Sequence, residues 1–296
     1  NQAAALNSIN LIALCLLATD KHVLTRVELV QQITFFLNLQ RTVPYSSQVT
    51  LPTDSADELI DHALKLQKVT QQNDSFGQLV QLSDNNAILL SYYRNNVLHL
   101  FMLPAIIASA ILHQRDVSAA ELKNIVQQLY PLLQRELFLD VADVEQYCTA
   151  IVQRLLDNGL AELDGKKYRA PAQHSQGYFL LNVLAHNAEH TLQRYAMVLQ
   201  LIERQGPQSR AELEKHSHEL AQRLLQLHGI NAPEYYDKQL FSTLLNALKD
   251  CGYTQTDQHS RVNSTAALHQ LNDTVSLLLR NDVLQSIQNI LPTSTR

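Results

Sequence analysis

Apolar residues recur along the chain at the spacing of α-helices, in blocks that short polar segments separate. Each of three apolar blocks is followed by a hydroxyl residue that stands three positions before a glutamate. Such a pair can satisfy two backbone N–H groups at the start of a helix, so it predicts a capping box. The predicted apolar helices lie at residues 10–17, 105–112 and 194–202, and the boxes that follow them are Thr25 with Glu28, Ser118 with Glu121, and Ser209 with Glu212.

The three boxes begin at residues 25, 118 and 209, so they lie 93 and 91 residues apart. After each box the pattern predicts a further helix that ends in a short polar turn, and Asp164-Gly165 is typical of a two-residue β-hairpin. The sequence therefore predicts a mainly α fold of helical bundle units with small β-hairpins, winged-helix-like, in three related units. The predicted domains are residues 1–84, residues 85–175, and residues 176–296 with the C-terminal helix.

Composition and charge argue against a nucleic-acid-binding protein. Hydrophobic residues make up 46% of the chain and the net charge is −5, which is typical of a folded globular protein without a basic surface. The predicted third helices of the first two units, residues 55–68 and 141–158, carry more acidic than basic residues. We therefore expect these units to pack against protein, with no nucleic-acid partner.

The positions of glycines, cysteines and apolar runs limit which cofactors the chain could bind and in which compartment it would lie. Seven glycines in 296 residues build no phosphate-cradling loop, so no cofactor of that kind is expected. Cys15, Cys148 and Cys251 lie in apolar helical patterns, as expected for reduced thiols in a cytosolic setting. The apolar runs at 9–18 and 97–112 are shorter than the roughly 18 residues that span a bilayer. Because the chain begins with asparagine, we expect a fragment of a larger protein.

One arginine interrupts an apolar helix face. At helical spacing, Arg94 has three apolar neighbours, Leu90, Val97 and Leu98. A buried cation without a partner is destabilising by several kcal/mol or so, so we expect its guanidinium to meet a carboxylate, a phosphate or backbone carbonyls.

Two interpretations of Arg94 stay open at this point. In the first, Arg94 forms a structural ion pair with a carboxylate from another helix, supported by the hydroxyl of Tyr92 or Tyr93. In the second, Arg94 and the side-chain amides of Asn95 and Asn96 form an interdomain contact or bind an anionic group. Arg94, Asn95 and Asn96 are therefore the candidate site residues.

The histidines suggest one metal motif. His186-Asn-Ala-Glu189-His190 has the HxxEH spacing of a zinc peptidase, but a chain of twelve histidines produces such spacings by chance, and no motif places a third ligand. A solvated polar helix face is the simpler interpretation. His216 and His218 point to different helix faces. We expect His228-Gly229 to end a helix and Pro233 to help begin the next.

Several segments resemble a known enzyme family. They are Tyr92-Tyr93-Arg94-Asn95-Asn96 with the downstream His99, and residues 41–46, 58–64 and 227–238. Together they resemble the C-terminal region of the membrane-associated glycerol-3-phosphate acyltransferases of the bacterial type. The resemblance covers nearly the whole chain, and weaker similarity runs from about residue 10 to residue 279.

The resemblance implies that the chemistry lies outside this chain. The family's catalytic motifs are a histidine with an aspartate five positions on and a Glu-Gly-x-Arg-Ser run. None of the twelve histidines has an aspartate at that spacing, and no glutamate precedes a glycine. We therefore expect no catalytic, cofactor-binding or metal-binding residue in this chain.

By resemblance, the parent enzyme would transfer an acyl group from acyl-CoA or acyl-ACP to glycerol 3-phosphate, giving lysophosphatidate for phospholipid biosynthesis. This chain would be its accessory scaffold, with the N-terminal acyltransferase domain as its partner. The parent would bind the membrane surface peripherally, at the cytoplasmic face of the bacterial inner membrane. The alternative is a stand-alone helical protein-interaction module without enzyme activity.

Overall fold

A computed structural model describes residues 2–19, 21–82, 84–114, 116–228 and 237–291. These residues form eleven α-helices and nine short strands, in which each sheet is small and antiparallel. The prediction of a mainly helical fold with small hairpins is therefore confirmed.

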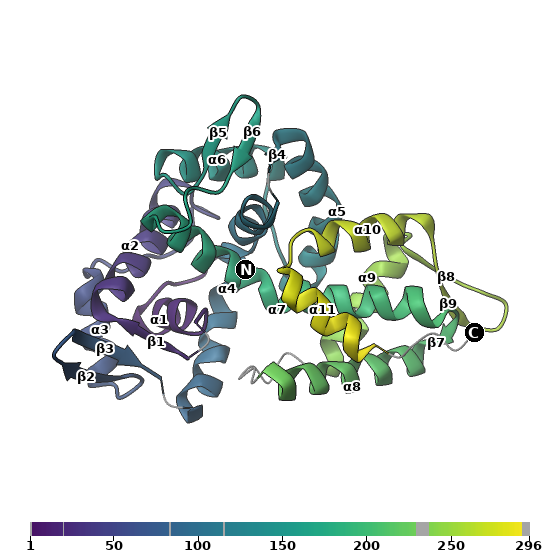
Figure 1. Ribbon diagram of the computed structural model, residues 1–296, viewed down its shortest axis with the longest axis horizontal. Coiled ribbons are helices and arrows are strands. Elements are labelled where there is room, and N and C mark those ends of the chain that lie inside the picture. The colour runs from purple at the N-terminus through teal and green to yellow at the C-terminus, as the bar shows by residue number, and fades with distance from the viewer. Residues whose placement is uncertain (1, 20, 83, 115, 229–236, 292–296) are drawn as a thin grey trace. The chain divides into compact units, whose positions relative to one another are not determined.

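The first repeat consists of a helix, a short strand, two helices and a hairpin. Figure 1 colours this repeat purple to blue, and α2 contacts both the third helix and the hairpin. Its elements are α1 (Ser8–Leu16), β1 (Val23–Thr25), α2 (Arg26–Thr42), α3 (Ala56–Lys65), β2 (Thr70–Asp74) and β3 (Gly77–Gln81).

The same order of elements occurs twice more along the chain. The second repeat contains α4 (Asp84–His113), β4 (Val117–Ser118), α5 (Ala119–Leu137), α6 (Val144–Asp157), β5 (Glu162–Asp164) and β6 (Lys167–Arg169). The third contains α7 (Gln176–Gln205), β7 (Gln208–Ser209), α8 (Arg210–His228), α9 (Lys238–Asp250), β8 (Thr254–Thr256) and β9 (Arg261–Ser264), and it is followed by α10 (Ala266–Ser276) and α11 (Asn281–Ile290). The winged-helix-like plan with three related units is thus confirmed.

All three predicted capping boxes are present at the starts of α2, α5 and α8. In the first, the Glu28 amide donates to the Thr25 hydroxyl at 3.2 Å, and the Thr25 amide donates to the Glu28 carboxylate at 3.0 Å. Ser118 with Glu121 and Ser209 with Glu212 repeat this geometry. A further box that we did not predict, Ser55 with Glu58, begins α3.

Each hairpin is held by regular antiparallel pairing. In the first sheet the strand order is β1-β3-β2, and buried Leu24 pairs with buried Val80. In the third the order is β7-β9-β8. The β5–β6 hairpin turns at the predicted Asp164-Gly165, with Asp164 opposite Lys167. Gly165 has φ of +61°, a backbone conformation that favours glycine.

By packing, the chain divides into two compact units that cut across the second repeat. One comprises Asn1–Leu112 and Asp140–Asn187, and the other His113–Leu139 and Ala188–Arg296. Repeats follow the order of elements along the chain, whereas compact units follow packing. The domain boundaries at residues 84 and 175 therefore stay a prediction.

Each compact unit has its own hydrophobic core. In the first, all nine residues of α1 are buried, and the rings of Phe36 in α2 and Phe101 in α4 meet edge to face at 5.0 Å. In the second, α9 packs on both α5 and α8, and Leu129 and Leu248 are fully buried. Burial of each large apolar side chain stabilises the folded state by about 1.5–3 kcal/mol relative to leaving it exposed.

Helices α4 and α7 are much longer than the apolar blocks at 105–112 and 194–202 predicted, which are only parts of them. Within α4, Pro104 has no N–H for the carbonyl of Leu100, and the Gln40 side-chain amide donates to that carbonyl at 3.1 Å instead. A tertiary contact therefore lets the helix continue through a proline.

The length of α4 corrects one prediction from the sequence. The segment Asn86–His113 is long and apolar enough to cross a bilayer, although the apolar run alone is shorter. However, 83% of its apolar stretch is buried inside the protein. This burial is the pattern of a core helix.

Candidate functional site

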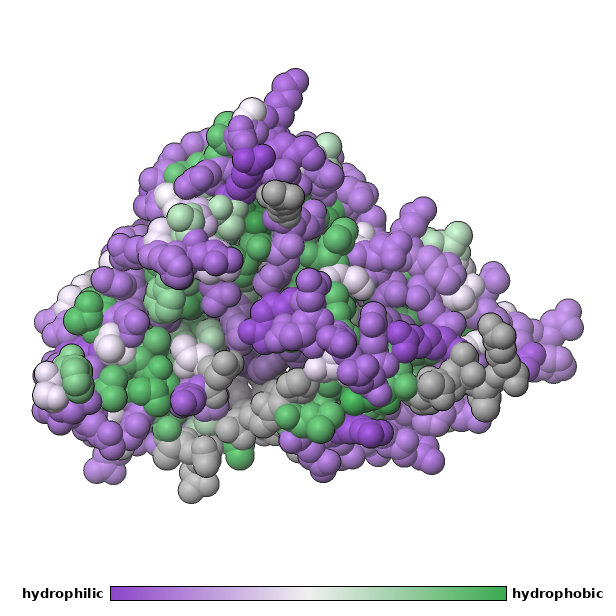
Figure 2. Space-filling view, in the orientation of Figure 1, coloured by the Kyte–Doolittle hydropathy of each residue, from purple (hydrophilic) through white to green (hydrophobic). Residues whose placement is uncertain are grey.

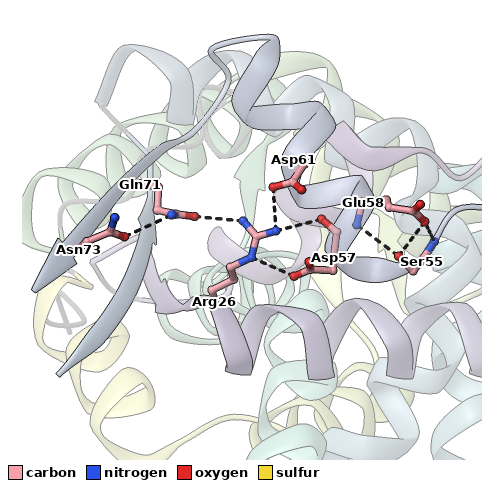
Figure 3. A network of polar contacts seen from close by, with 7 residues as sticks. All are labelled: Arg26, Ser55, Asp57, Glu58, Asp61, Gln71 and Asn73. Atoms are coloured by element: carbon pink, nitrogen blue, oxygen red, sulfur yellow. Dashed lines mark hydrogen bonds and ion pairs between the residues drawn. The ribbon is translucent and has the colours of Figure 1, made fainter.

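The densest polar cluster of the first repeat surrounds Arg26, the first residue of α2. Its Nε donates to Asp57 Oδ1 at 2.9 Å, its Nη2 to Asp61 Oδ1 at 2.7 Å, and its Nη1 to Gln71 Oε1 at 3.0 Å. Figure 3 shows the guanidinium between the two aspartates of α3 on one side and Gln71 of β2 on the other. Through these hydrogen bonds, Arg26 connects the start of α2 to α3 and to the hairpin.

Local sequence places each member of the Arg26 cluster. The Thr25 cap makes Arg26 the first helical residue, and the Ser55 cap places Asp57 in the first turn of α3. Asp61 follows one turn later and faces the same way. The hydrogen bond from Arg26 lowers the pKa of Asp57, so this carboxylate is charged at neutral pH and is engaged by an arginine. Such a pair suits structure better than proton transfer.

A groove of about 940 Å³ adjoins this cluster, between the start of α2 and the β2–β3 hairpin. Its lining residues include Arg26 and Asp57 of the cluster. Its apolar residues are Val27, Val30, Phe76 and Leu79. The groove is thus an apolar hollow with charged groups at its edge.

The candidate residues Arg94, Asn95 and Asn96 lie within α4. Arg94 is buried, as predicted, with 8% of its surface exposed. Its Nε and Nη2 lie 3.4 Å from the side-chain oxygen of Asn95, so these contacts are long. Asn96 is exposed. The structure brings Arg94 and Asn95 together, and the partner role of Arg94 stays a prediction.

Two segments that carry the family resemblance meet in the first compact unit. The ring of Tyr45, from residues 41–46, packs edge to face on the ring of His99 in α4, with centroids 5.4 Å apart. The Tyr45 hydroxyl accepts a hydrogen bond from the Asp140 amide at 2.7 Å. Tyr147 of α6 also packs on Tyr45, and burial raises the pKa of Tyr147. This aromatic cluster joins α4, α6 and the loop after α2.

The proposed metal motif gains no support from the arrangement of α7. Glu189 accepts a hydrogen bond from Gln193 at 3.0 Å, and Arg280 Nη2 lies 3.9 Å from the same oxygen. Among the described residues, no three His, Cys, Asp or Glu side chains are placed to hold one metal ion. His186 and His190 therefore find no third protein ligand in the part of the chain that the structure describes.

The other histidine and cysteine predictions concern structural roles. His216 Nδ1 lies 3.0 Å from the Gln208 side-chain oxygen. The predicted helix end at Gly229 and helix start at Pro233 lie outside the described residues. The cysteines are free, as predicted, with Cys15 buried and Cys148 and Cys251 half-buried. Burial raises the pKa of Cys148 to about 12, so this thiol stays protonated and unreactive.

A buried ion pair that the sequence did not reveal lies in the second compact unit. Arg194 of α7 binds the carboxylate of Glu136 in α5, and each side chain is only 4% exposed. The Thr191 hydroxyl oxygen lies 3.4 Å from Arg194 Nη2. Burial and the charge of Glu136 raise the pKa of the neighbouring Tyr195. The argument made for Arg94, that a cation on an apolar helix needs a carboxylate, therefore holds at Arg194.

A second glutamate of α7 contacts α10. Glu203 accepts a hydrogen bond from Asn272 Nδ2 at 2.7 Å, His269 Nδ1 lies 2.7 Å from its other carboxylate oxygen, and burial raises the pKa of Glu203. His269 is 60% exposed. A glutamate beside a histidine can act in acid–base catalysis. Here, however, the two side chains connect α7 to α10 at the surface of the protein.

Taken together, these contacts define a class of protein. Helix caps, interhelical ion pairs and buried aromatic rings connect the helices at each of these places. Such a molecule is a mainly helical protein built from winged-helix-like repeats.

Comparison with known proteins identifies the family. The chain belongs to the family described as "Glycerol-3-phosphate acyltransferase C-terminal region", whose model matches residues 1–257. It is 36% identical to the glycerol-3-phosphate acyltransferase of Pseudoalteromonas atlantica over 292 residues, which is 98% of this chain and 36% of that protein. It is 37% identical to those of Shewanella amazonensis and a further Shewanella strain over 287 residues, or 97% of the chain and 34% of each relative. The chain therefore spans about a third of the length of these curated relatives.

Proposed function

We propose that this chain is the C-terminal accessory region of a glycerol-3-phosphate 1-O-acyltransferase, and that it acts as a scaffold for the part that carries the chemistry. That part would transfer an acyl group from acyl-CoA or acyl-ACP to glycerol 3-phosphate, giving lysophosphatidate. The acceptor and the reaction class follow from the relatives, which are glycerol-3-phosphate acyltransferases.

One observation carries this proposal: the match to the C-terminal family region runs through residues 1–257, while the curated relatives are about three times as long as the chain. The structure supports it because the charged groups have structural partners. Asp57 and Asp61 bind Arg26, and Glu136 binds Arg194. A general acid or base needs a carboxyl group that is available to substrate.

We also propose a location at the cytoplasmic face of the bacterial inner membrane, with attachment through the rest of the parent protein. Free thiols at Cys15, Cys148 and Cys251 fit a reducing compartment. The apolar helix α4 is mostly buried within the protein, so it offers little surface to lipid. The membrane contact is therefore assigned to the acyltransferase part.

An acyl-transfer assay on three proteins tests the proposal. The first is this chain alone, the second is the Pseudoalteromonas relative without its matched region, and the third is that truncated relative with this chain fused in place of the region. We expect no turnover from the chain alone, a strong loss of activity or solubility on truncation, and recovery in the fusion. Turnover by the chain alone would refute the scaffold role.

A truncated relative that is as active and as stable as the intact enzyme would also refute it. That result would favour the alternative, a helical interaction module that acts independently of the acyltransferase.

A further inference from the structure

The groove beside Arg26 exposes an unusual amount of apolar surface for a small hairpin. Phe76 is 96% exposed and Val27 is 66% exposed, and both line the groove. Figure 2 shows hydrophobic residues at the surface over the region where Figure 1 places α1, α3 and the β2–β3 hairpin. A large aromatic side chain fully in water is a typical anchor for a partner.

The backbone holds Phe76 in this exposed position. The Phe76 amide donates to Asp74 Oδ1 at 2.7 Å, which closes the turn between the two strands. Gly77 follows with φ of +137°, a conformation that favours glycine. The turn presents the ring on a fixed support, so little ordering is needed when a partner binds.

The edge of the groove is acidic. The side chains of Asp57 and Asp61 are 60% and 52% exposed, and Asp74 is also exposed. Arg26 is the basic residue among the described residues that line the groove, and its side chain is only 14% exposed because the two aspartates of α3 bind it. The electrostatic potential at the groove is therefore negative, so it favours a cationic partner and repels the phosphate groups of lipids or nucleic acids.

We propose that this groove docks a segment of the acyltransferase part of the same protein, one with an apolar anchor between lysine or arginine residues. The inference rests on the proposed function, since that function supplies the acyltransferase part. In the relatives, nearly two thirds of the length lies outside the region that this chain matches. The apolar floor takes the anchor, and the acidic edge, where Asp57 and Asp61 outnumber the one arginine that they share, attracts the flanking cations.

The position of the N-terminal residues agrees with this occupant. Ala4 and Leu6 exchange backbone hydrogen bonds with Thr50, at 2.9 Å each, and Thr50 lies seven residues before Asp57 at the groove. Seven residues reach at most about 25 Å. A polypeptide joined ahead of Ala4 would thus enter within reach of the groove.

Hydrogen–deuterium exchange on the fusion with the truncated Pseudoalteromonas relative tests the docking. We expect the amides of residues 25–31 and 74–79 to exchange at least about tenfold more slowly in the fusion than in the chain alone. The double variant Val27→Ser with Phe76→Ser should remove this protection. It should also lower the temperature at which the fusion loses its acyl-transfer activity. Raising the salt concentration should also weaken the protection from exchange, because salt screens the attraction between charges.

Leu163→Ser is the matched control, because Leu163 is 58% exposed on the equivalent β5–β6 hairpin and lies outside the groove. This variant should keep the protection. Since all three side chains are exposed, the isolated chains should unfold at nearly the same temperature as the unchanged chain.

The outcomes separate the two proposals. An active fusion whose groove exchanges as fast as in the chain alone overturns the docking and leaves the accessory role standing. An inactive fusion without protection on any surface overturns both. Docking is also overturned if the chain alone forms a dimer that the double variant abolishes, or if phosphatidylglycerol vesicles bind the groove, because then the occupant is a second copy or lipid.

Discussion

The side-chain amide of Gln40 donates a hydrogen bond to the carbonyl of Leu100, which Pro104 leaves without its helical donor. The side-chain oxygen of Gln40 accepts at the same time from the Tyr45 amide at 3.1 Å. One buried side chain therefore satisfies two backbone groups, one in α4 and one in the loop after α2.

Replacing Gln40 with methionine should lower the free energy of unfolding by about 1–3 kcal/mol, because two buried backbone groups lose their partner. In a Pro104→Ala background the loss should be smaller, since the alanine restores a helical N–H for the carbonyl of Leu100. Urea unfolding of the four proteins of this cycle measures the difference. Equal losses in both backgrounds would contradict the role assigned to Pro104.

Arg194→Ala should destabilise the second compact unit by about 3–5 kcal/mol, because it leaves the Glu136 carboxylate buried without its cation. The apolar pair Arg194→Met with Glu136→Leu should cost much less, since neither charge is then buried. Thermal and urea unfolding measure both.

The control for Arg194 is Arg135→Ala. Arg135 pairs with Asp250, but both side chains are about half exposed, so solvent screens the pair and its loss should have little effect. If the Arg135 and Arg194 variants lose similar stability, burial does not decide the strength of these pairs.

Arg94→Ala should lower thermal stability, because Arg94 is buried in α4. A structural ion pair predicts a loss of several kcal/mol or so in the chain alone. An interdomain contact predicts that the loss is found only in the fusion with the acyltransferase part. Asn96→Ala, at an exposed position, is the control. Unchanged stability and unchanged activity in both proteins would exclude both interpretations.

Gly177→Ala should destabilise the chain by about 1–3 kcal/mol, because a Cβ at this position in the first turn of α7 would collide with the carbonyl oxygen of Gly159. Alanine is otherwise the better helix former, so an unhindered site would gain stability. The neighbouring Gln176→Ala is the control, since Gln176 is exposed. A higher melting temperature for Gly177→Ala would show that the two backbones lie further apart.

Asp257 should titrate near pH 2. Backbone amides of Arg261 and His259, together with the Arg261 side chain, lower the pKa of its carboxyl group to about 2, whereas an unfolded aspartate has a pKa of about 3.9. Its contribution to the stability of the β8–β9 turn is therefore complete above about pH 4 and is lost as the pH falls toward 2. Carboxyl-carbon NMR measures the midpoint.

In the Asp257→Asn variant, the protection of the amides in this turn, taken relative to the intrinsic exchange rate at each pH, should no longer change between pH 4 and pH 2. A wild-type midpoint close to the unfolded value would show that the turn does not hold the carboxylate.

Local features of the fold were open to prediction from the sequence. The boxes at Thr25, Ser118 and Ser209 need only two residues three positions apart, and the turn at Asp164-Gly165 needs only two neighbours. Because these signals recur in the same order, the repeats could be predicted as well. The box of Ser55 with Glu58 follows the same rule, so the sequence carries its signal as well.

Long-range features could not be predicted in the same way. Nothing local relates Arg194 to Glu136, 58 residues away, or Arg26 to Asp57, 31 residues away. Likewise, an apolar run ending near Pro104 gave no sign that Gln40 lets α4 continue through the proline. The sequence did predict that Arg94 is buried, because burial follows from the helix face.

The first compact unit is discontinuous along the chain, since Asp140–Asn187 returns to complete what Asn1–Leu112 begins. During synthesis, the first compact unit can therefore complete its core only after residue 187 has left the ribosome. A gene truncated after residue 112 would yield an incomplete core with exposed apolar surface, a target for chaperones and proteases. Because the two compact units alternate along the chain, neither can be expressed alone as one uninterrupted segment, even though the repeats suggest places to cut.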